Sequence, residues 1–255
     1  MITARFLSFN RGPRGIFRDV SFDIGPGEFV AIIGPNGAGK STLLQVMTGA
    51  LKPAGGEMSF DRKPIASWRK SDLALRRAVL SQSTQVAFPF TVEETLALSV
   101  PDGVAWAHLP AIMRNALAQV GLSGFENRVL QELSGGEQQR VHLARVLTQI
   151  EMTRGAHPQA LFLDEPVAGL DLRHQIETMQ LARKLTGEKL AVIAVIHDLN
   201  LVKSYASRLL CIHEGRLVAD GTPKKVLTPA LIRTVFEVKA KVQHDGALAF
   251  SQMGA

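Results

Sequence analysis

Four short apolar runs organise the sequence, at residues 29–33, 78–80, 160–163 and 190–196. Their length and their content of Val and Ile are typical of strands that are buried on both faces of a parallel sheet. The segments between them show helical spacing instead, and one apolar helical face comprises Leu172, Ile176, Met179 and Ala182. Strands that alternate with helices predict an α/β fold with a mainly parallel sheet.

Polar residues follow each of these runs. Gly34 opens a glycine-rich loop, Gln82 lies two residues after the second run, and Asp164 and His197 come directly after the third and fourth. In open α/β sheets, ligands bind at the edge where the carboxyl ends of the strands meet. The pattern therefore predicts one composite site at that edge.

The remaining segments differ from this pattern. Residues 84–134 contain three prolines and no buried-strand run, which indicates a mostly helical lobe inserted between two strands. The first 25 residues are expected to form short strands with polar turns, and residues 211–221 to form a strand pair with Gly215 in its turn. From residue 229 onward we expect a short helix and an extended end.

Composition narrows the class of protein. Of the 255 residues, 46% are apolar and 20% are charged, which excludes a disordered chain. We expect neither a signal peptide nor a transmembrane helix, since the latter needs roughly 18 consecutive apolar residues. The single cysteine, Cys211, excludes a disulfide scaffold. The net charge of +6 comes from scattered basic residues, which favours a mixed surface over a nucleic-acid patch.

The glycine-rich loop fits the pattern of a phosphate-binding loop, Gly, four residues, then Gly-Lys-Ser/Thr. It follows a predicted strand and precedes a predicted helix, as that motif requires. The glycines allow backbone N–H groups to converge on phosphate oxygens at a helix N-terminus. Lys40 supplies charge to the outer phosphates, and the Ser41 hydroxyl is placed to ligate Mg²⁺. The predicted binding residues are Gly34, Pro35, Asn36, Gly37, Ala38, Gly39, Lys40, Ser41 and Thr42.

Two acidic residues end the third apolar run. A carboxylate at that strand end, Asp164, can hold Mg²⁺ directly or through water. The next residue, Glu165, can polarise an attacking water as a general base. An ordinary acidic pair at a strand end is the alternative, and the phosphate loop in the same chain argues against it.

Paired glycines open the helical stretch that follows Leu133. Ser134 and Glu137 have the spacing of a capping box, which would be a purely structural role. Gly135 and Gly136, however, disfavour a helix at this point. Glycines at a helix start suggest a close backbone approach, with phosphate as the expected ligand.

The string Leu-Ser-Gly-Gly-Glu-Gln at residues 133–138 resembles the signature motif of ATP-binding-cassette (ABC) ATPases. Residues 34–42, the pair Asp164 and Glu165, and His197 are similar to that family's Walker A, Walker B and switch-histidine motifs, in the family's order. The resemblance covers about residues 3–228. It implies a P-loop NTPase core with a mainly parallel sheet, an N-terminal antiparallel β part and an inserted helical subdomain, with ATP and Mg²⁺ as cofactors.

The resemblance also implies roles for individual residues. Phe9 would stack on adenine, and Gln82 would reach Mg²⁺ and the attacking water. His197 would contact the γ-phosphate, and Asp171 would lie at a subunit interface. The family works as a dimer, in which the Ser134 segment of one subunit, with Gly135 and Gly136, closes over ATP held by the other.

The same resemblance implies one nucleotide-binding domain over residues 1–255. Its core would span 1–83 and 135–228, its helical subdomain 84–134 and its tail 229–255. Two departures from the family pattern are present. Residues 167–169 read Val-Ala-Gly where Thr-Ser-Ala is usual, which bears on dimer geometry, and residues 151–158 suggest an additional surface loop.

A cassette of this kind implies two permease subunits, reached through the 84–134 lobe, and a periplasmic substrate-binding protein that acts through the permease. The implied location is peripheral, at the cytoplasmic face of the bacterial inner membrane. Three strings, at 87–94, 150–159 and 226–232, are similar to the haem-importer branch, with iron-siderophore and vitamin B12 importers as the alternative. Nucleic-acid cassettes are disfavoured because no coiled coil, large insertion or second cassette is present.

Overall fold

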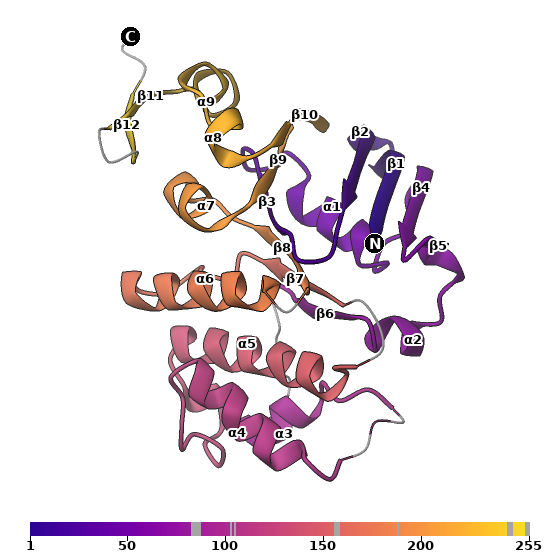
Figure 1. Ribbon diagram of the computed structural model, residues 1–255, viewed down its shortest axis with the longest axis vertical. Coiled ribbons are helices and arrows are strands. Elements are labelled where there is room, and N and C mark those ends of the chain that lie inside the picture. Colours follow the sequence, from indigo (N-terminus) through magenta and orange to yellow (C-terminus); the bar gives the residue numbers. More distant parts are fainter. Residues whose placement is uncertain are drawn as a thin grey trace.

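The computed structural model describes residues 1–82, 88–102, 104, 106–155, 159–187, 189–243 and 247–252 (Figure 1). Its strands are β1 (Ile2–Arg11), β2 (Arg14–Ile24), β3 (Phe29–Ile33), β4 (Gly55–Phe60), β5 (Lys63–Pro64), β6 (Arg77–Leu80), β7 (Ala160–Asp164), β8 (Ala191–Val195), β9 (Arg208–His213), β10 (Arg216–Gly221), β11 (Val238–Val242) and β12 (Leu248–Gln252). Its α-helices are α1 (Lys40–Met47), α2 (Lys70–Ala74), α3 (Val92–Ala97), α4 (Leu109–Gln119), α5 (Gly135–Met152), α6 (Leu172–Thr186), α7 (Leu199–Tyr205), α8 (Pro223–Val226) and α9 (Pro229–Phe236).

The central sheet has the strand order β10-β9-β3-β8-β7-β6. The four strands predicted from apolar runs, β3, β8, β7 and β6, are adjacent and parallel, which confirms the mainly parallel α/β fold. Every residue of β3, β7 and β8 is buried, because helices and the second sheet cover both faces. The carboxyl ends of these strands therefore meet at one edge, where the predicted site residues lie.

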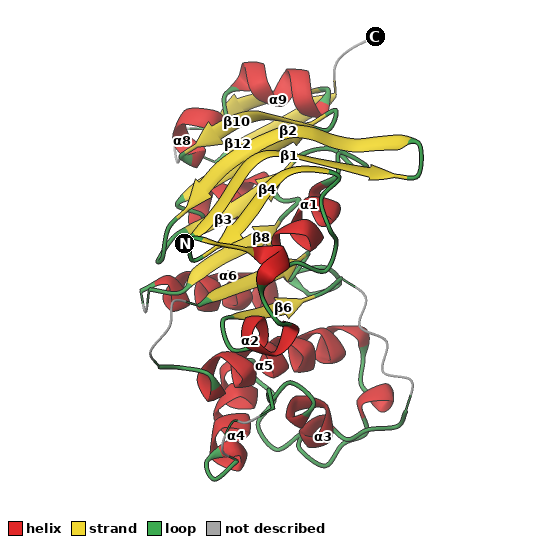
Figure 2. Ribbon diagram, turned by 90° about the vertical axis from the view of Figure 1, so that its right-hand side faces the viewer, coloured by secondary structure: helices red, strands yellow, loops and turns green. Residues whose placement is uncertain are grey.

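A second sheet, with the order β2-β1-β4-β5, is antiparallel (Figure 2). Its first two strands are longer than the short strands expected, with 10 and 11 residues. Register shifts interrupt the β1–β2 ladder, and Phe6 has a positive φ of 49° at one of them. Such bulges break the strict alternation of apolar and polar residues, which explains why the sequence pattern suggested shorter strands. Side chains of α1 pack in the core shared by the two sheets.

Helices α3, α4 and α5 form the lobe at the bottom of Figure 1, and α5 also contacts β6. The helical character of the inserted segment is as predicted, whereas the boundary at residues 83/84 lies outside the described residues. The predicted apolar face of α6 buries Met179, but Leu172 at its start is 69% exposed. Within the described residues, no helix combines the length and apolarity needed to cross a membrane.

The C-terminal segment is more ordered than a helix with an extended end. After α9, strands β11 and β12 pair as an antiparallel hairpin, from Val238 with Gln252 to Val242 with Leu248. The strand pair β9–β10 has Gly215 in its turn, as predicted, with a φ of 69°. The expected loop at 151–158 begins later than predicted because α5 continues to Met152, and residues 156–158 lie outside the described part.

Candidate nucleotide and metal site

The loop between β3 and α1 has a backbone that only glycine tolerates at two positions. Gly34 has a φ of 149°, and a Cβ there would lie 2.0 Å from the carbonyl oxygen of Ile212. Gly39 has a φ of 99° and is the N-cap of α1, where a Cβ would meet Ile16 at 3.1 Å. Side chains are excluded at both points, so the chain folds tightly around the N-terminus of α1. Backbone N–H groups and the helix dipole then favour an anion at this position.

Lys40 begins α1 and is only 6% exposed. Its Nζ donates hydrogen bonds to the carbonyl oxygens of Gly34 at 2.9 Å and Pro35 at 2.8 Å. Burial lowers the pKa of the Lys40 ammonium, and the nearby carboxylates of Glu165 and Asp164 partly counter this effect. The loop thus holds a desolvated cation, which interacts with an incoming phosphate more strongly than an exposed lysine would.

Ser41 and Asp164 connect α1 to the end of β7. The Ser41 Oγ donates to Asp164 Oδ1 at 2.9 Å, and Asp164 is 5% exposed. Burial raises the pKa of the Asp164 carboxyl, while the Ser41 hydrogen bond opposes that rise. A hydroxyl and a carboxylate beside a phosphate loop form an oxygen donor set that suits Mg²⁺, which prefers few protein ligands together with substrate phosphates and water. The predicted metal residues Ser41 and Asp164 fit the ion.

Glu165 lies at the centre of a hydrogen-bonded group. Gln82 Nε2 donates to its Oε2 at 2.9 Å, and His197 Nε2 lies 2.8 Å from its Oε1. The backbone of Glu165 has a φ of 53°, a strained conformation for a residue with a side chain. Three side chains that lie far apart in the sequence therefore meet at the strand edge, as their positions after three separate strands predicted.

A pocket of about 300 Å³ lies between the phosphate loop, Glu165 and His197. Its opposite wall comes from Arg11, Arg14 and Ile16 at the junction of β1 and β2. Phe9 is not among the lining residues. Its ring instead stacks on Phe17, with 6.1 Å between centroids and 27° between planes. The stacking role predicted for Phe9 stays a prediction, while Arg11, Arg14 and Ile16 are additional residues that the structure places at this wall.

The start of α5 holds the other predicted binding residues. The Ser134 Oγ accepts a hydrogen bond from the Glu137 N–H, and the Glu137 carboxylate accepts one from the Ser134 N–H, so the predicted capping box is present. The hydrogen bonds that the Ser134 hydroxyl and the Ser134 N–H donate to the Glu137 carboxylate lower the pKa of that carboxyl. Gly136 lies beside the next loop, because a Cβ on it would be 3.6 Å from the carbonyl oxygen of Gly169.

Asp171 ends that neighbouring loop and caps α6. Its Oδ1 accepts a hydrogen bond from the His174 N–H at 2.9 Å, and this bond is the main cause of its lowered pKa. The residues that line the pocket beside the phosphate loop include neither Asp171 nor the Ser134, Gly135 and Gly136 turn. Within one described chain, the predicted site thus consists of a phosphate half and a separate signature half.

Comparisons with known proteins agree with this geometry. A family model described as ABC transporter matches residues 17–168. The chain is 47% identical over 248 residues to the hemin import ATP-binding protein HmuV of Bradyrhizobium diazoefficiens, which covers 96% of this chain and 92% of that protein. It is 45% identical over 245 residues to the protein of the same name from Rhizobium meliloti, covering 95% and 93%.

Two solved structures are similar along most of the chain. CbiO1 from Clostridium perfringens, described as part of the ABC transporter complex cbiONQ, has a TM-score of 0.75 and 30% identity, covering 91% of this chain and 92% of that one. The ATP-binding cassette MJ0796, solved as a dimer in a post-hydrolysis state with ADP and Pi, has a TM-score of 0.74 and 26% identity, covering 88% and 99%.

Proposed function

The chain belongs to the ABC transporter family, and we propose that it energises a bacterial importer whose substrate is haem. As a nucleotide-binding subunit of that family, it binds ATP and hydrolyses it to drive transport. One observation supports the ATPase chemistry: three features lie next to one another. They are the phosphate loop, the Ser41–Asp164 hydrogen bond, and the Glu165 carboxylate, which contacts two other side chains. The choice of haem is supported by the name of relatives that share 45–47% of their residues with this chain.

The contacts support a catalytic role for each of these residues. Mg²⁺, held by Ser41 and Asp164 with Gln82 near, would neutralise charge on the outer phosphates when bound. Glu165 accepts hydrogen bonds through both carboxylate oxygens, so it is oriented to accept a proton from an attacking water. His197 lies on the other side of that carboxylate and also lines the pocket, where it can contact the γ-phosphate.

Import subunits of this family work as dimers with membrane permeases. We propose that the signature half described above closes over the phosphate half of a second copy, which would complete the site. The exposed Ser134 and the glycines beside it support this arrangement, because they carry no bulky side chain at the helix start. We also propose that a periplasmic substrate-binding protein acts through the permease, and that this chain lies at the cytoplasmic face of the inner membrane.

Replacing Lys40 with alanine is expected to raise the Kd for ATP about tenfold or more. The change removes a buried cation, and hydrogen bonds to charged groups contribute about 1.5–3 kcal/mol each. Titration of purified protein with ATP, followed by calorimetry, measures the effect. Lys52→Ala, at an exposed lysine after α1, is the matched control, and an unchanged Kd in Lys40→Ala would contradict the phosphate-loop assignment.

The substrate is tested by reconstitution. The tagged chain is purified from its own cells together with the permease that it binds, and the complex is placed in liposomes. We expect ATP-dependent uptake of hemin that is lost in Lys40→Ala. Uptake of a ferric siderophore or vitamin B12, with none of hemin, would refute haem as the substrate while leaving the ATPase assignment intact.

A further inference from the structure

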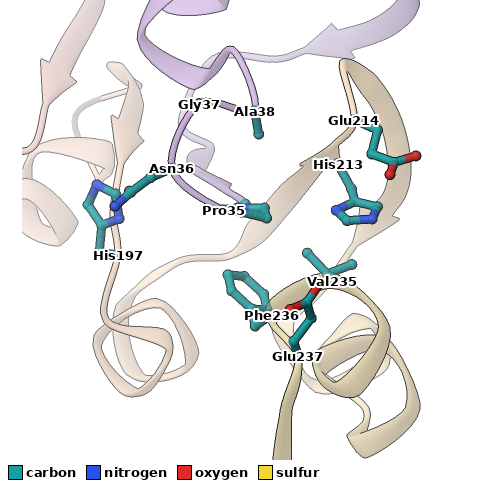
Figure 3. Close-up of a pocket in the computed structure, with 11 residues that line it drawn as sticks. Pro35, Asn36, Gly37, Ala38, His197, His213, Glu214, Val235, Phe236 and Glu237 are labelled. Carbon is teal, nitrogen blue, oxygen red and sulfur yellow. The ribbon is translucent and has the colours of Figure 1, made fainter.

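A second pocket, of about 560 Å³, lies on the other side of the phosphate loop (Figure 3). We name it the outer pocket. One wall is the loop itself, with Pro35 and Asn36, and another is the β9–β10 turn with His213 and Glu214. The end of α9 forms the third wall, where Figure 3 shows Phe236 across the pocket from Pro35. None of the catalytic roles assigned above uses the α9 wall.

The turn after α9 shapes this wall. Glu237 caps the helix in a left-handed conformation, with a φ of 57°, and the chain then enters β11. Val235 is buried against the core, whereas Phe236 is partly exposed at the pocket. Two carboxylates, Glu214 and Glu237, lie at exposed positions on the rim. The outer pocket therefore combines an apolar wall with negative charge.

The pocket also contains an unsatisfied polar atom. Nδ1 of His213 is buried and has no hydrogen-bond partner among the described residues.

A complementary surface lies at the start of α6. Leu172 is 69% exposed, although it lies on the same apolar face as the buried residues Met179 and Ala182. Arg173 follows it with a side chain that is 82% exposed and pairs only at the surface with Glu177. Burial of a leucine side chain contributes about 1.5–3 kcal/mol. An apolar side chain next to a cation is the chemistry that the outer pocket would accept.

The start of α6 is continuous with the signature turn. A Cβ on Gly136 would lie 3.6 Å from both the carbonyl oxygen of Gly169 and the Leu170 side chain, so the two segments form one surface. The phosphate loop likewise joins the two pockets, since Asn36, Gly37 and His197 line both. If the signature turn of one copy closed on the inner side of the loop, the start of its α6 would lie next to the outer side.

We propose that the outer pocket is a docking site for a second copy of this chain, which inserts Leu172 against Pro35 and Phe236. Arg173 of that copy then lies near Glu214 and Glu237. The inference rests on the proposed dimer and goes beyond it, because it makes the C-terminal helix α9 part of the nucleotide-dependent interface. Closure of the dimer thereby buries a part of the chain that lies outside the phosphate and signature motifs.

Disulfide cross-linking tests the contact directly. The chain carries Leu172→Cys and Phe236→Cys together, in a Glu165→Gln background, and is oxidised with and without ATP. Burial raises the pKa of the natural Cys211 thiol to about 12, so this cysteine should not react. We expect a covalent dimer on a denaturing gel that needs both new cysteines and ATP. A pair of Leu172→Cys with Phe6→Cys, an equally exposed position on β1, is the control.

A second pair separates this inference from the proposed function. Ser134→Cys with Asn36→Cys, at an exposed side chain of the phosphate loop, reports closure of the signature turn over that loop. If this pair cross-links with ATP while Leu172 and Phe236 do not, the docking site is refuted and the composite ATP site stands. If neither pair cross-links, both proposals are refuted. Equal cross-linking to Phe6→Cys would show random collision and would also refute the docking site.

Charge exchange provides a measurement that does not depend on cysteine geometry. Arg173→Glu and Glu237→Arg should each weaken ATP-dependent dimerisation about three- to tenfold, as followed by analytical ultracentrifugation. The double variant should recover most of the lost association, because the opposite charges face one another again. Additive losses in the double variant would contradict a direct contact between these two positions.

Discussion

Replacing Glu165 with glutamine is expected to slow ATP hydrolysis about 10²–10⁴-fold, the contribution of a positioned general base. Glutamine has the same shape and can keep the hydrogen bond that Gln82 donates, but it cannot accept a proton from water. ATP binding should stay intact because Lys40 and the loop are unchanged. The ATP-bound dimer should therefore accumulate, which size-exclusion chromatography with light scattering measures alongside the release of phosphate.

The matched control is Glu57→Gln, which makes the same chemical change at an exposed residue of β4. It should leave turnover unchanged. Near-normal turnover in Glu165→Gln, measured in the complex with its permease, would remove Glu165 from the role of base. The hydrogen bonds of Gln82 and His197 to Glu165 would then only stabilise the local structure.

The core of the fold could be predicted because its strands are buried on both faces. β3, β7 and β8 are apolar runs that lie side by side and parallel, so the topology brings the residues near their carboxyl ends, Asp164, Glu165 and His197, to one edge. The phosphate loop could also be predicted from the sequence. Its backbone geometry requires glycine at positions 34 and 39, and any sequence that forms this loop must meet that requirement.

The sequence was less informative where tertiary contacts, and not the periodicity of apolar residues, decide the position of a side chain or the presence of a strand. The resemblance implied an adenine-stacking role for Phe9, but the ring of Phe9 stacks on Phe17, its cross-strand partner in β2, so that role stays a prediction. No local signal marked Arg11, Arg14 and Ile16, which reach the pocket because the β1–β2 turn lies beside the phosphate loop. The β11–β12 hairpin was missed because its strands are partly exposed and contain no continuous apolar run.

Leu172 illustrates the same point on a helix. Its spacing placed it on the buried face of α6, and the first turn of that helix extends beyond the core. Helical periodicity identifies which residues share a face, but it does not say where the covering layer ends. The exposed leucine is therefore a tertiary feature, and it is also the observation from which the docking proposal starts.

Replacing Ser134 with arginine should abolish ATPase activity and transport while leaving ATP binding by the monomer within about twofold. The bulky side chain would block closure of the signature turn over the partner's phosphate loop, whereas each chain's own loop stays open. Ser134→Ala is the control, because it removes the cap to Glu137, at a cost of about 0.5–2 kcal/mol, without filling space. Calorimetry and phosphate release distinguish the two variants.

Mixed dimers show whether the two halves of a site come from different chains. With Ser134→Arg in one subunit and Lys40→Ala in the other, both lesions fall on the same composite site and the second site stays intact. With both lesions in one subunit, each composite site carries one lesion. If the sites act separately, the first arrangement should retain up to about half of the activity and the second almost none. Full activity in Ser134→Arg homodimers would refute the composite site, since no closure over phosphate could then be required for hydrolysis.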